Sequence, residues 1–163
     1  MGADTIIAAS ATVIALASVA VSVTEARAGR EHNRRSVRPI LQLRKEFPVG
    51  ERGGLRVTNV GLGPAAITRT ELWLDGVHVG GTDRDGTDRV RANLPGPRPW
   101  AVSFGAGAFL ATDYDQYLLS VGSYDPRQHD AFVDLIRNRL RVRITYDSLY
   151  GGESFTVERG PDI

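Results

Sequence analysis

The stretch from Thr5 to Val23 holds 19 consecutive residues without a charge, and this feature constrains the fold of the chain more than any other. At a rise of about 1.5 Å per residue, a helix of this length is just under ~30 Å long, close to the hydrocarbon thickness of a bilayer. Eight of its residues are strongly apolar: Ile6, Ile7, Val13, Ile14, Leu16, Val19, Val21 and Val23. The stretch therefore predicts a transmembrane anchor over residues 1–24.

A cleaved signal peptide is the alternative interpretation of the same stretch. Ala26-Arg27-Ala28 has the small-x-small form of a cleavage site. The residues before Thr5 carry no Lys or Arg, however, and the apolar run is longer than a typical signal-peptide core. An uncleaved anchor is the interpretation that we prefer.

A basic juxtamembrane segment, residues 25–39, follows the anchor. Residues 25–45 carry seven cations and two acids, a net charge of +5, whereas residues 46–163 carry 13 cations and 16 acids, a net charge of −3. Because cytoplasmic flanks are enriched in Lys and Arg, this asymmetry predicts a single-pass inner (plasma) membrane protein with its C-terminal domain in the cytoplasm. The cations that we expect near anionic membrane lipid are Arg27, Arg30, Arg34, Arg35 and Arg38.

After Pro39 the pattern changes to short alternating segments separated by Gly- and Pro-rich turns. The predicted strands are 40–47, 55–60, 65–74, 77–80, 100–104, 117–121, 139–146 and 154–158, with a helix over 125–138 and irregular structure over 81–99. Short strands at regular spacing are typical of a sandwich. We therefore predict a mainly β chain, with an immunoglobulin-like antiparallel β-sandwich and one short helix over residues 40–163, preceded by the N-terminal transmembrane helix.

Three short motifs resemble those of a known group of proteins. They are the runs from His32 to Pro39, from Asn59 to Ala65 and from Tyr146 to Gly151. With the preceding hydrophobic helix, they resemble a group of uncharacterised small bacterial proteins that have one N-terminal membrane helix and a β-sandwich domain. This resemblance implies the architecture and no activity.

The sequence offers few groups for chemistry. It contains no cysteine, which excludes disulfides, thiolate zinc sites and cysteine nucleophiles. The closely spaced carboxylates Asp83, Asp85 and Asp88 are weak candidates for Ca²⁺ ligands, but the position that the EF-hand loop gives to glutamate is Leu94 here. We expect a solvated turn there, and no metal or other cofactor.

No catalytic or nucleotide-binding motif is recognisable. The chain lacks a phosphate loop, paired-histidine spacing and the Gly-x-Ser-x-Gly nucleophile turn, so we expect no enzyme activity. The arginine stripe 137, 139, 141 and 143 is not interleaved with aromatic residues, and we expect it to pair with acids such as Glu153 and Glu158 rather than to bind nucleic acid.

Trp73 is predicted to share the outer face of its strand with Arg69 and Glu71, and an exposed tryptophan among charges is typical of a protein-contact surface. The sequence thus favours a membrane-anchored, non-enzymatic binding or assembly module that contacts a protein partner or a second copy of itself. The alternative is an exported or surface β-sandwich that binds a ligand such as a glycan or Ca²⁺.

Overall fold

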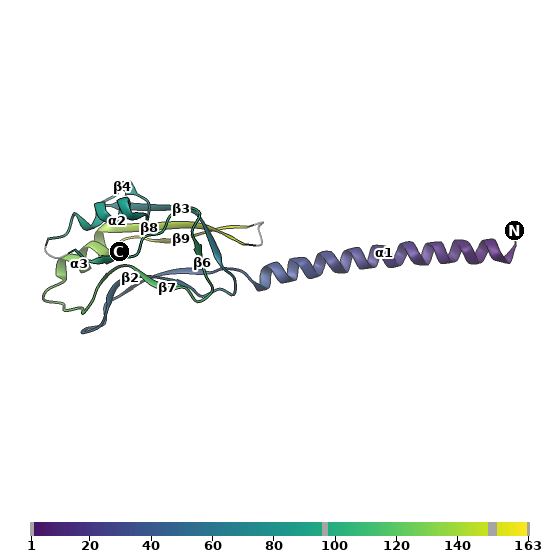
Figure 1. Cartoon of the computed structure of the whole chain (residues 1–163), viewed down its shortest axis with the longest axis horizontal. Coiled ribbons are helices and arrows are strands. Elements are labelled where there is room, and N and C mark those ends of the chain that lie inside the picture. The colour runs from purple at the N-terminus through teal and green to yellow at the C-terminus, as the bar shows by residue number, and fades with distance from the viewer. Residues whose placement is uncertain (1, 96–97, 150–152, 163) are drawn as a thin grey trace. The chain divides into compact units, whose positions relative to one another are not determined.

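A computed structural model describes residues 2–95, 98–149 and 153–162 of the chain (Figure 1). The chain separates into two compact units, residues 1–37 and 38–163. The first unit consists of helix α1 (Ala3–Ser36), within which side chains are described at positions 12–27 and 29. The second unit is a two-sheet β-domain with short helices.

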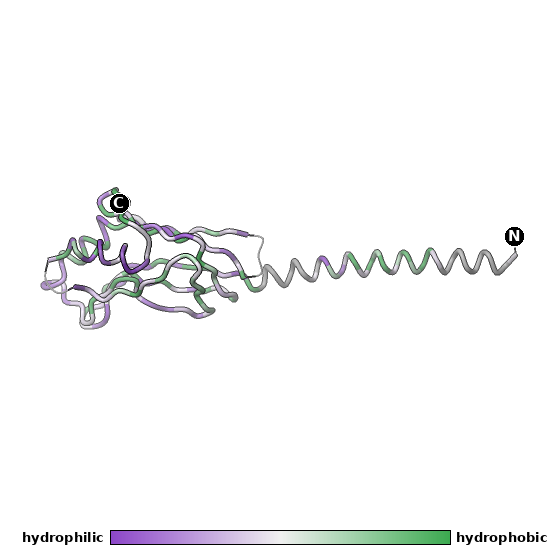
Figure 2. The backbone as a smooth tube through the Cα atoms, turned by 45° about the horizontal axis from the view of Figure 1, so that its top comes forward, coloured by the Kyte–Doolittle hydropathy of each residue, from purple (hydrophilic) through white to green (hydrophobic). Residues whose placement is uncertain are grey.

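Helix α1 runs without interruption through both the predicted anchor and most of the predicted basic segment. Its large described apolar side chains are exposed: Val13, Ile14, Leu16, Val19, Val21 and Val23. In Figure 2 the backbone tube has the hydrophobic colour along much of the described part of α1. Within the described part of the chain, no helix has the combined length and apolarity of a membrane span. Residues 5–11 of the predicted anchor lie outside the described side chains. The helix ends shortly before Pro39 because the residue preceding a proline is driven out of the helical region.

The β-domain consists of two antiparallel sheets. The first has the strand order β1-β2-β7-β5, and the second has the order β4-β3-β8-β9 with β6 beside the start of β3. The bounds of the first sheet are Leu41–Glu46 (β1), Gly53–Asn59 (β2), Asp115–Val121 (β7) and Trp100–Ala101 (β5). Those of the second are Val77–Gly80 (β4), Ala65–Leu74 (β3), Leu140–Ser148 (β8), Ser154–Arg159 (β9) and Phe109–Leu110 (β6).

The core forms from side chains that alternate along these strands. In β8, Leu140, Val142 and Ile144 are buried, whereas the intervening arginines point outward. Period-two alternation places such residues on opposite faces of a sheet. Every buried apolar residue of the described chain lies between Leu41 and Tyr146, so the β-domain has a hydrophobic core of its own.

The eight predicted strands are all present, with ends that differ by up to a few residues, but the connections differ from prediction. Residues 84–91 form helix α2 (Arg84–Arg91), where irregular structure was expected. The Asp83 side chain begins this helix by accepting the backbone N–H of Gly86 at 2.8 Å. A Cβ atom at Gly86 would lie 1.9 Å from the Gly81 carbonyl oxygen, so only glycine permits the observed approach of α2 to β4. The predicted helix over 125–138 is shorter, with α3 at Asp130–Asp134 and a π-helical turn at Leu135–Arg139.

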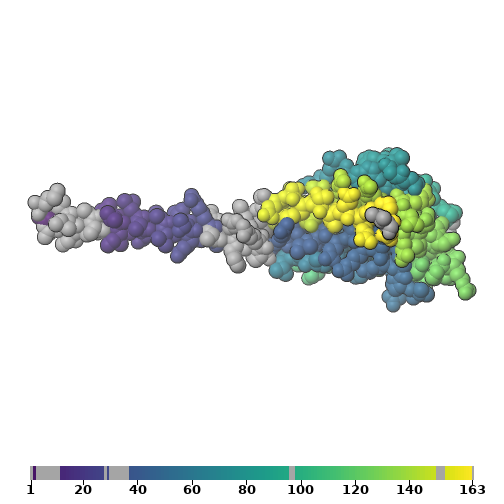
Figure 3. Space-filling view, turned by 180° about the vertical axis from the view of Figure 1, so that it is seen from behind, coloured from purple at the N-terminus to yellow at the C-terminus, as the bar shows by residue number. Residues whose placement is uncertain are grey.

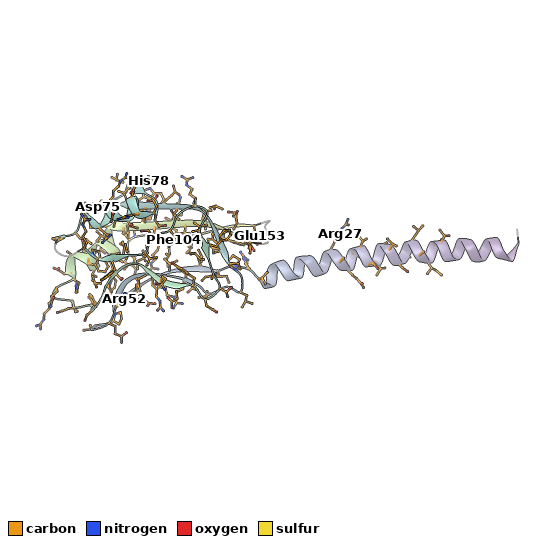
Figure 4. All side chains as sticks on the ribbon, viewed as in Figure 1. Arg27, Arg52, Asp75, His78, Phe104 and Glu153 are labelled. Atoms are coloured by element: carbon orange, nitrogen blue, oxygen red, sulfur yellow. The ribbon has the colours of Figure 1, made fainter. Side chains whose placement is uncertain are left out.

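The β-domain has two ends, which we call the entry end and the distal end. The entry end holds Arg38, where the chain enters the domain, together with the starts of β1 and β3 and the ends of β2 and β8. The distal end holds the β3–β4 hairpin and α3. In Figure 4, Glu153 lies at the entry end, whereas Asp75 and His78 lie at the distal end. The seven residues of β7 span roughly 20 Å between these ends.

Asn59 organises the entry end. Its side chain is 2% exposed, and its amide oxygen accepts the backbone N–H groups of Ile40 at 3.2 Å and Gly61 at 3.1 Å. Its amide nitrogen lies 2.9, 3.3 and 3.0 Å from the carbonyl oxygens of Gly63, Leu110 and Ala111. One side chain therefore joins the start of β1, the turn after β2 and the segment after β6.

Lys45, the one lysine among the 20 cationic residues, holds the C-terminal segment against β1. Its side chain is 4% exposed, and its ammonium group donates to the carbonyl oxygens of Arg137 and Gly160 and to the Asp162 carboxylate at 2.8–2.9 Å. Figure 3 shows the C-terminal strand in yellow beside the early strands in blue. An ammonium group has three hydrogen atoms to donate, and each has an acceptor here.

Candidate functional site

The distal end carries a pocket of about 300 Å³ between the segment after α2 and the segment that joins β7 to α3. We call it the distal pocket. Its apolar lining consists of Leu94, Pro95, Pro99, Trp100, Val121, Ala131 and Phe132, and its other lining residues are Arg98, Gly122, Gln128, His129 and Asp130. A largely apolar cavity with a few polar groups at its margin is the usual form of a ligand or peptide site.

Trp100 lies at the opening of this pocket. It belongs to β5, which pairs with β7 in the register Trp100↔Ser120, so its backbone is held by the sheet. Its side chain is nevertheless 71% exposed. A large aromatic side chain that is fixed by a strand and uncovered has a high capacity for contact with a partner, because little conformational entropy is lost when it is buried.

Aromatic contacts lie behind two of the lining residues of the pocket, Phe132 and His129. The Phe47 ring lies 5.4 Å from the Tyr124 ring and 6.2 Å from the Phe132 ring, and the Tyr124 ring lies 6.2 Å from the His129 ring. The backbone N–H of Asp125 donates to Nδ1 of His129 at 3.0 Å. Nδ1 of His129 also lies 3.2 Å from the Asp125 carbonyl oxygen, so the ring is held against the backbone of Asp125.

The polar groups of the pocket can form hydrogen bonds with a ligand. The lining includes the Arg98 guanidinium and the Trp100 indole N–H, which are donors, the Asp130 carboxylate, which is an acceptor, and the His129 imidazole. Ser120, which pairs with Trp100 in the β5–β7 register, is 2% exposed and offers no accessible nucleophile. The arrangement can hold an apolar group and a few hydrogen-bonding groups of a partner.

Two of the three predicted metal candidates, Asp83 and Asp88, have other partners in the structure. Asp83 caps α2, Asp85 lies in the first turn of that helix, and Asp88 pairs with Arg91 at 2.8 Å. In the part of the chain that the structure describes, no three His, Cys, Asp or Glu residues are grouped as metal ligands.

Trp73, Arg69 and Glu71 share the outer face of β3, as predicted, but Trp73 is half-buried rather than fully exposed. The guanidinium carbon of Arg143 lies 5.2 Å from its ring centroid, and the His78 ring lies 5.5 Å away. Arg69 donates to Glu71 at 2.7 Å. This face is a cluster of mutually paired side chains, and the more exposed tryptophan is the one in the distal pocket.

The arginine stripe on β8 pairs with acids. Arg139 pairs with Asp75 at 2.6 Å, and Arg143 and Arg141 pair with Glu158 at 2.7 and 3.6 Å. The hydrogen bond from Arg139 lowers the pKa of the Asp75 carboxyl and raises the pKa of Arg139 itself. The predicted partner Glu158 is confirmed, and Asp75 and Glu71 are additional partners.

A second ionic cluster lies on the outer face of the first sheet. Arg56 donates hydrogen bonds to Asp115 and Glu46, and both bonds raise the pKa of Arg56. The bond to Asp115 has the larger effect. The pKa of Asp115 is lowered by the same bond. Desolvation and the nearby Glu46 raise the pKa of Tyr117, whose hydroxyl donates to the Arg52 carbonyl oxygen at 3.2 Å. These groups join β1, β2 and β7 on the outer face of the sheet.

The cations predicted to lie near lipid are only partly described. Arg27 is exposed on α1, and it is labelled in Figure 4. The guanidinium carbon of Arg38 lies 4.2 Å from the Phe155 ring centroid. The side chains of Arg30, Arg34 and Arg35 lie outside the described residues.

Comparison with known proteins adds no functional information, because no protein-family model, curated protein or solved structure matches the chain. The distal pocket was not predicted from the sequence. Trp100 has the alternating neighbours of an ordinary strand residue, and only the three prolines at 95, 97 and 99 indicate that its strand begins at an irregular segment.

Proposed function

We propose that this chain is a single-pass protein of the bacterial inner membrane that displays an immunoglobulin-like β-sandwich at the cytoplasmic surface as a non-enzymatic binding or assembly module. The observation that carries the proposal is that one chain contains both an apolar helix with exposed side chains and a domain with the distal pocket, which Trp100 lines. The distal pocket is the site that would receive a protein partner or a second copy of the chain.

The sequence and the exposure of α1 support the anchor. The 19 uncharged residues include positions 5–11, whose side chains lie outside the described part of α1. The described side chains beyond them, such as Ile14 and Leu16, are 65% and 67% exposed. Apolar side chains over several consecutive turns are costly to leave in water, at about 25 cal/mol per Å², so they require a covering medium.

The strand order supports the immunoglobulin-like assignment. If β1, β2, β7 and β5 correspond to strands A, B, E and D, then β4, β3, β8 and β9 correspond to C′, C, F and G. Both sheets then have the neighbours expected for that fold. Under this correspondence, the distal pocket lies beside the connection between strands E and F, which joins β7 to β8.

The charge distribution supports a cytoplasmic location. The cations of residues 25–39 follow the uncharged stretch, and no cation precedes it. A glycan ligand on an exported domain is the second candidate, since an exposed tryptophan beside Gln128 and Asp130 is also suited to a sugar ring with hydroxyl groups. The two candidates require opposite sides of the membrane.

The location of the C-terminus is the first test. Reporters that are active only in the cytoplasm or only outside it are fused after residue 163, and the size of each fusion is measured. A full-length fusion with cytoplasmic activity is expected. Activity outside the cytoplasm would contradict the orientation and favour the glycan candidate.

The second test addresses the distal pocket in intact cells. A photoreactive phenylalanine analogue replaces Arg98 at the pocket or, as the control, Val77, which is 66% exposed on β4. We expect a discrete cross-linked species from position 98 that disappears with Trp100→Ala and is not formed from position 77. Cross-links that are equal at both positions, or that persist in Trp100→Ala, would contradict a partner site at the pocket.

A further inference from the structure

Five large apolar residues are exposed at the entry end of the β-domain. Their exposed fractions range from 45% to 73%, and we call them the entry rim: Ile40, Val60, Leu62, Phe109 and Leu149. Exposed apolar residues that stand singly are common on soluble domains, but a group of them at one place marks an interaction surface.

Hydrogen bonds and strand pairing bring these five residues together from four segments of the chain. The backbone N–H of Val60 donates to the Ile40 carbonyl oxygen at 2.8 Å, and that of Leu62 donates to the Arg38 carbonyl oxygen at 3.1 Å. Phe109 pairs with Ala66, and Leu149 follows Ser148, which pairs with Ala65. The entry rim therefore surrounds the point at which the chain enters the domain.

The buried side chain of Asn59 fixes the rim segments, so their exposure is built into the fold. Its amide binds the backbone on both sides of the rim, at Ile40 and at Leu110. A Cβ atom at Gly61 would lie 2.4 Å from the Arg38 carbonyl oxygen and from the Ile40 nitrogen, so the turn lies directly against the entering chain. Leu62 is thereby held at the outside of this turn.

We propose that the entry rim rests on the cytoplasmic leaflet of the membrane, a contact that presupposes the anchor of the proposed function. Arg38 follows Val23, the last residue of the uncharged stretch, by only 15 residues, so the rim cannot move far from the bilayer. Such a tether keeps the effective concentration of a weak binding surface high. Apolar side chains and the arginines before them then contact the membrane together, the apolar groups at the acyl boundary and the cations at anionic headgroups.

The length of α1 makes this proposal specific. The 13 residues from Thr24 to Ser36 are helical and about 20 Å long, more than the thickness of a headgroup layer. Because α1 is unbroken from Ala3 to Ser36, contact of the rim with the leaflet requires this part of the helix to bend away from the membrane-spanning part and to run along the headgroups, where its arginines pair with anionic lipid. A second copy is a less favourable occupant, because two segments with the same excess of arginine would repel each other.

Contact of the rim with lipid would orient the binding site. The distal pocket lies at the opposite end of the domain, about 20 Å away along β7. It would then face the cytoplasm, where Trp100 is accessible to a soluble or membrane-bound partner.

The absence of cysteine from the chain permits a direct test with single labels. The full chain with Leu62→Cys or Val49→Cys is labelled with an environment-sensitive fluorophore and placed in vesicles of phosphatidylcholine and phosphatidylglycerol with a doxyl-lipid quencher. Val49 is a matched control for Leu62, because the two side chains are 72% and 73% exposed. Val49 lies in the turn between β1 and β2 at the distal end. We expect quenching at position 62 that is at least twofold greater than at position 49.

A third label, at Leu16→Cys on α1, separates failure of the rim contact from failure of the anchor. Strong quenching at position 16 with equal weak quenching at positions 62 and 49 would overturn the rim proposal and leave the anchor intact. Absence of quenching at position 16 would overturn the anchor and, with it, the rim contact. Disulfide-linked dimers of unlabelled Leu62→Cys, formed without quenching at position 62, would assign the rim to a second copy instead and overturn the lipid contact.

Discussion

Replacing Asn59 with alanine tests the physical account of the entry end most directly. The substitution removes both bonds to the amide oxygen and all of the contacts between the amide nitrogen and the carbonyl oxygens of Gly63, Leu110 and Ala111. The side chain is 2% exposed, so water replaces these partners poorly. The amide has two N–H groups for three carbonyls, and we therefore count four net hydrogen bonds.

At about 1 kcal/mol for each net hydrogen bond, Asn59→Ala is expected to lower the free energy of unfolding by about 3–5 kcal/mol. This is a large fraction of the 5–15 kcal/mol that is typical of a domain. For a unit of this size we expect the melting temperature to fall by about 10–20 °C. The measurement is urea unfolding of residues 38–163, which contain the whole described core, followed by circular dichroism and tryptophan fluorescence.

The neighbouring residue supplies the control. The Thr58 hydroxyl is buried and, within the described chain, has no hydrogen-bond partner. Thr58→Val keeps the shape of the side chain and removes a polar group that costs free energy to bury, so it is expected to be neutral or stabilising by up to about 1 kcal/mol. A loss below 1 kcal/mol for Asn59→Ala, or an equal loss for both variants, would refute the reasoning.

The other predictions concern the ionic contacts. Lys45→Met keeps the length of the side chain but leaves Asp162 and the carbonyl oxygens of Arg137 and Gly160 without their donor. We therefore expect the free energy of unfolding, measured in urea, to fall by about 3–5 kcal/mol. Lys45→Arg is not expected to restore this stability, because a guanidinium cannot occupy the space of an ammonium. The pKa of Asp115 is lowered by Arg56, so the stability from this carboxylate is present above its ordinary pKa and is lost as the pH falls through the lowered value. Asp115→Asn is therefore expected to lower the urea midpoint at pH 6, and its effect is expected to shrink as the pH falls below the ordinary pKa of an aspartate. A difference that grows on acidification would contradict the assignment.

Most of the sandwich could be predicted from the sequence because its strands follow a simple physical pattern. Leu140, Val142 and Ile144 alternate with arginines, and this periodicity decides both the strand and its inner face. Asp75 and Gly76 form the tight turn of the β3–β4 hairpin with φ angles of 52° and 81°, which is the left-handed conformation that this residue pair favours.

Helix α2 could not be predicted because its sequence contains almost no apolar periodicity. Val90 is its one large buried apolar residue, and the helix depends on the Asp83 cap and on the close approach of Gly86 to Gly81. The distal pocket was missed for a related reason. It is formed by segments that begin near Leu94 and Gly122, and no local pattern indicates that they meet.

The distribution of exposed apolar side chains links the fold to the proposed function. The domain buries its core residues almost completely, with exposed fractions of 0–7%, yet it leaves Leu62 and Trp100 more than 70% exposed at opposite ends. A fold that packs its interior this well has no structural need for either residue at the surface. The two residues differ from the equally exposed Val49 in their setting, since Leu62 lies in the entry rim and Trp100 lines the distal pocket, and we propose lipid as the surroundings of the first and a partner as those of the second. Exchanging each for serine should leave the urea midpoint unchanged and affect only the corresponding contact.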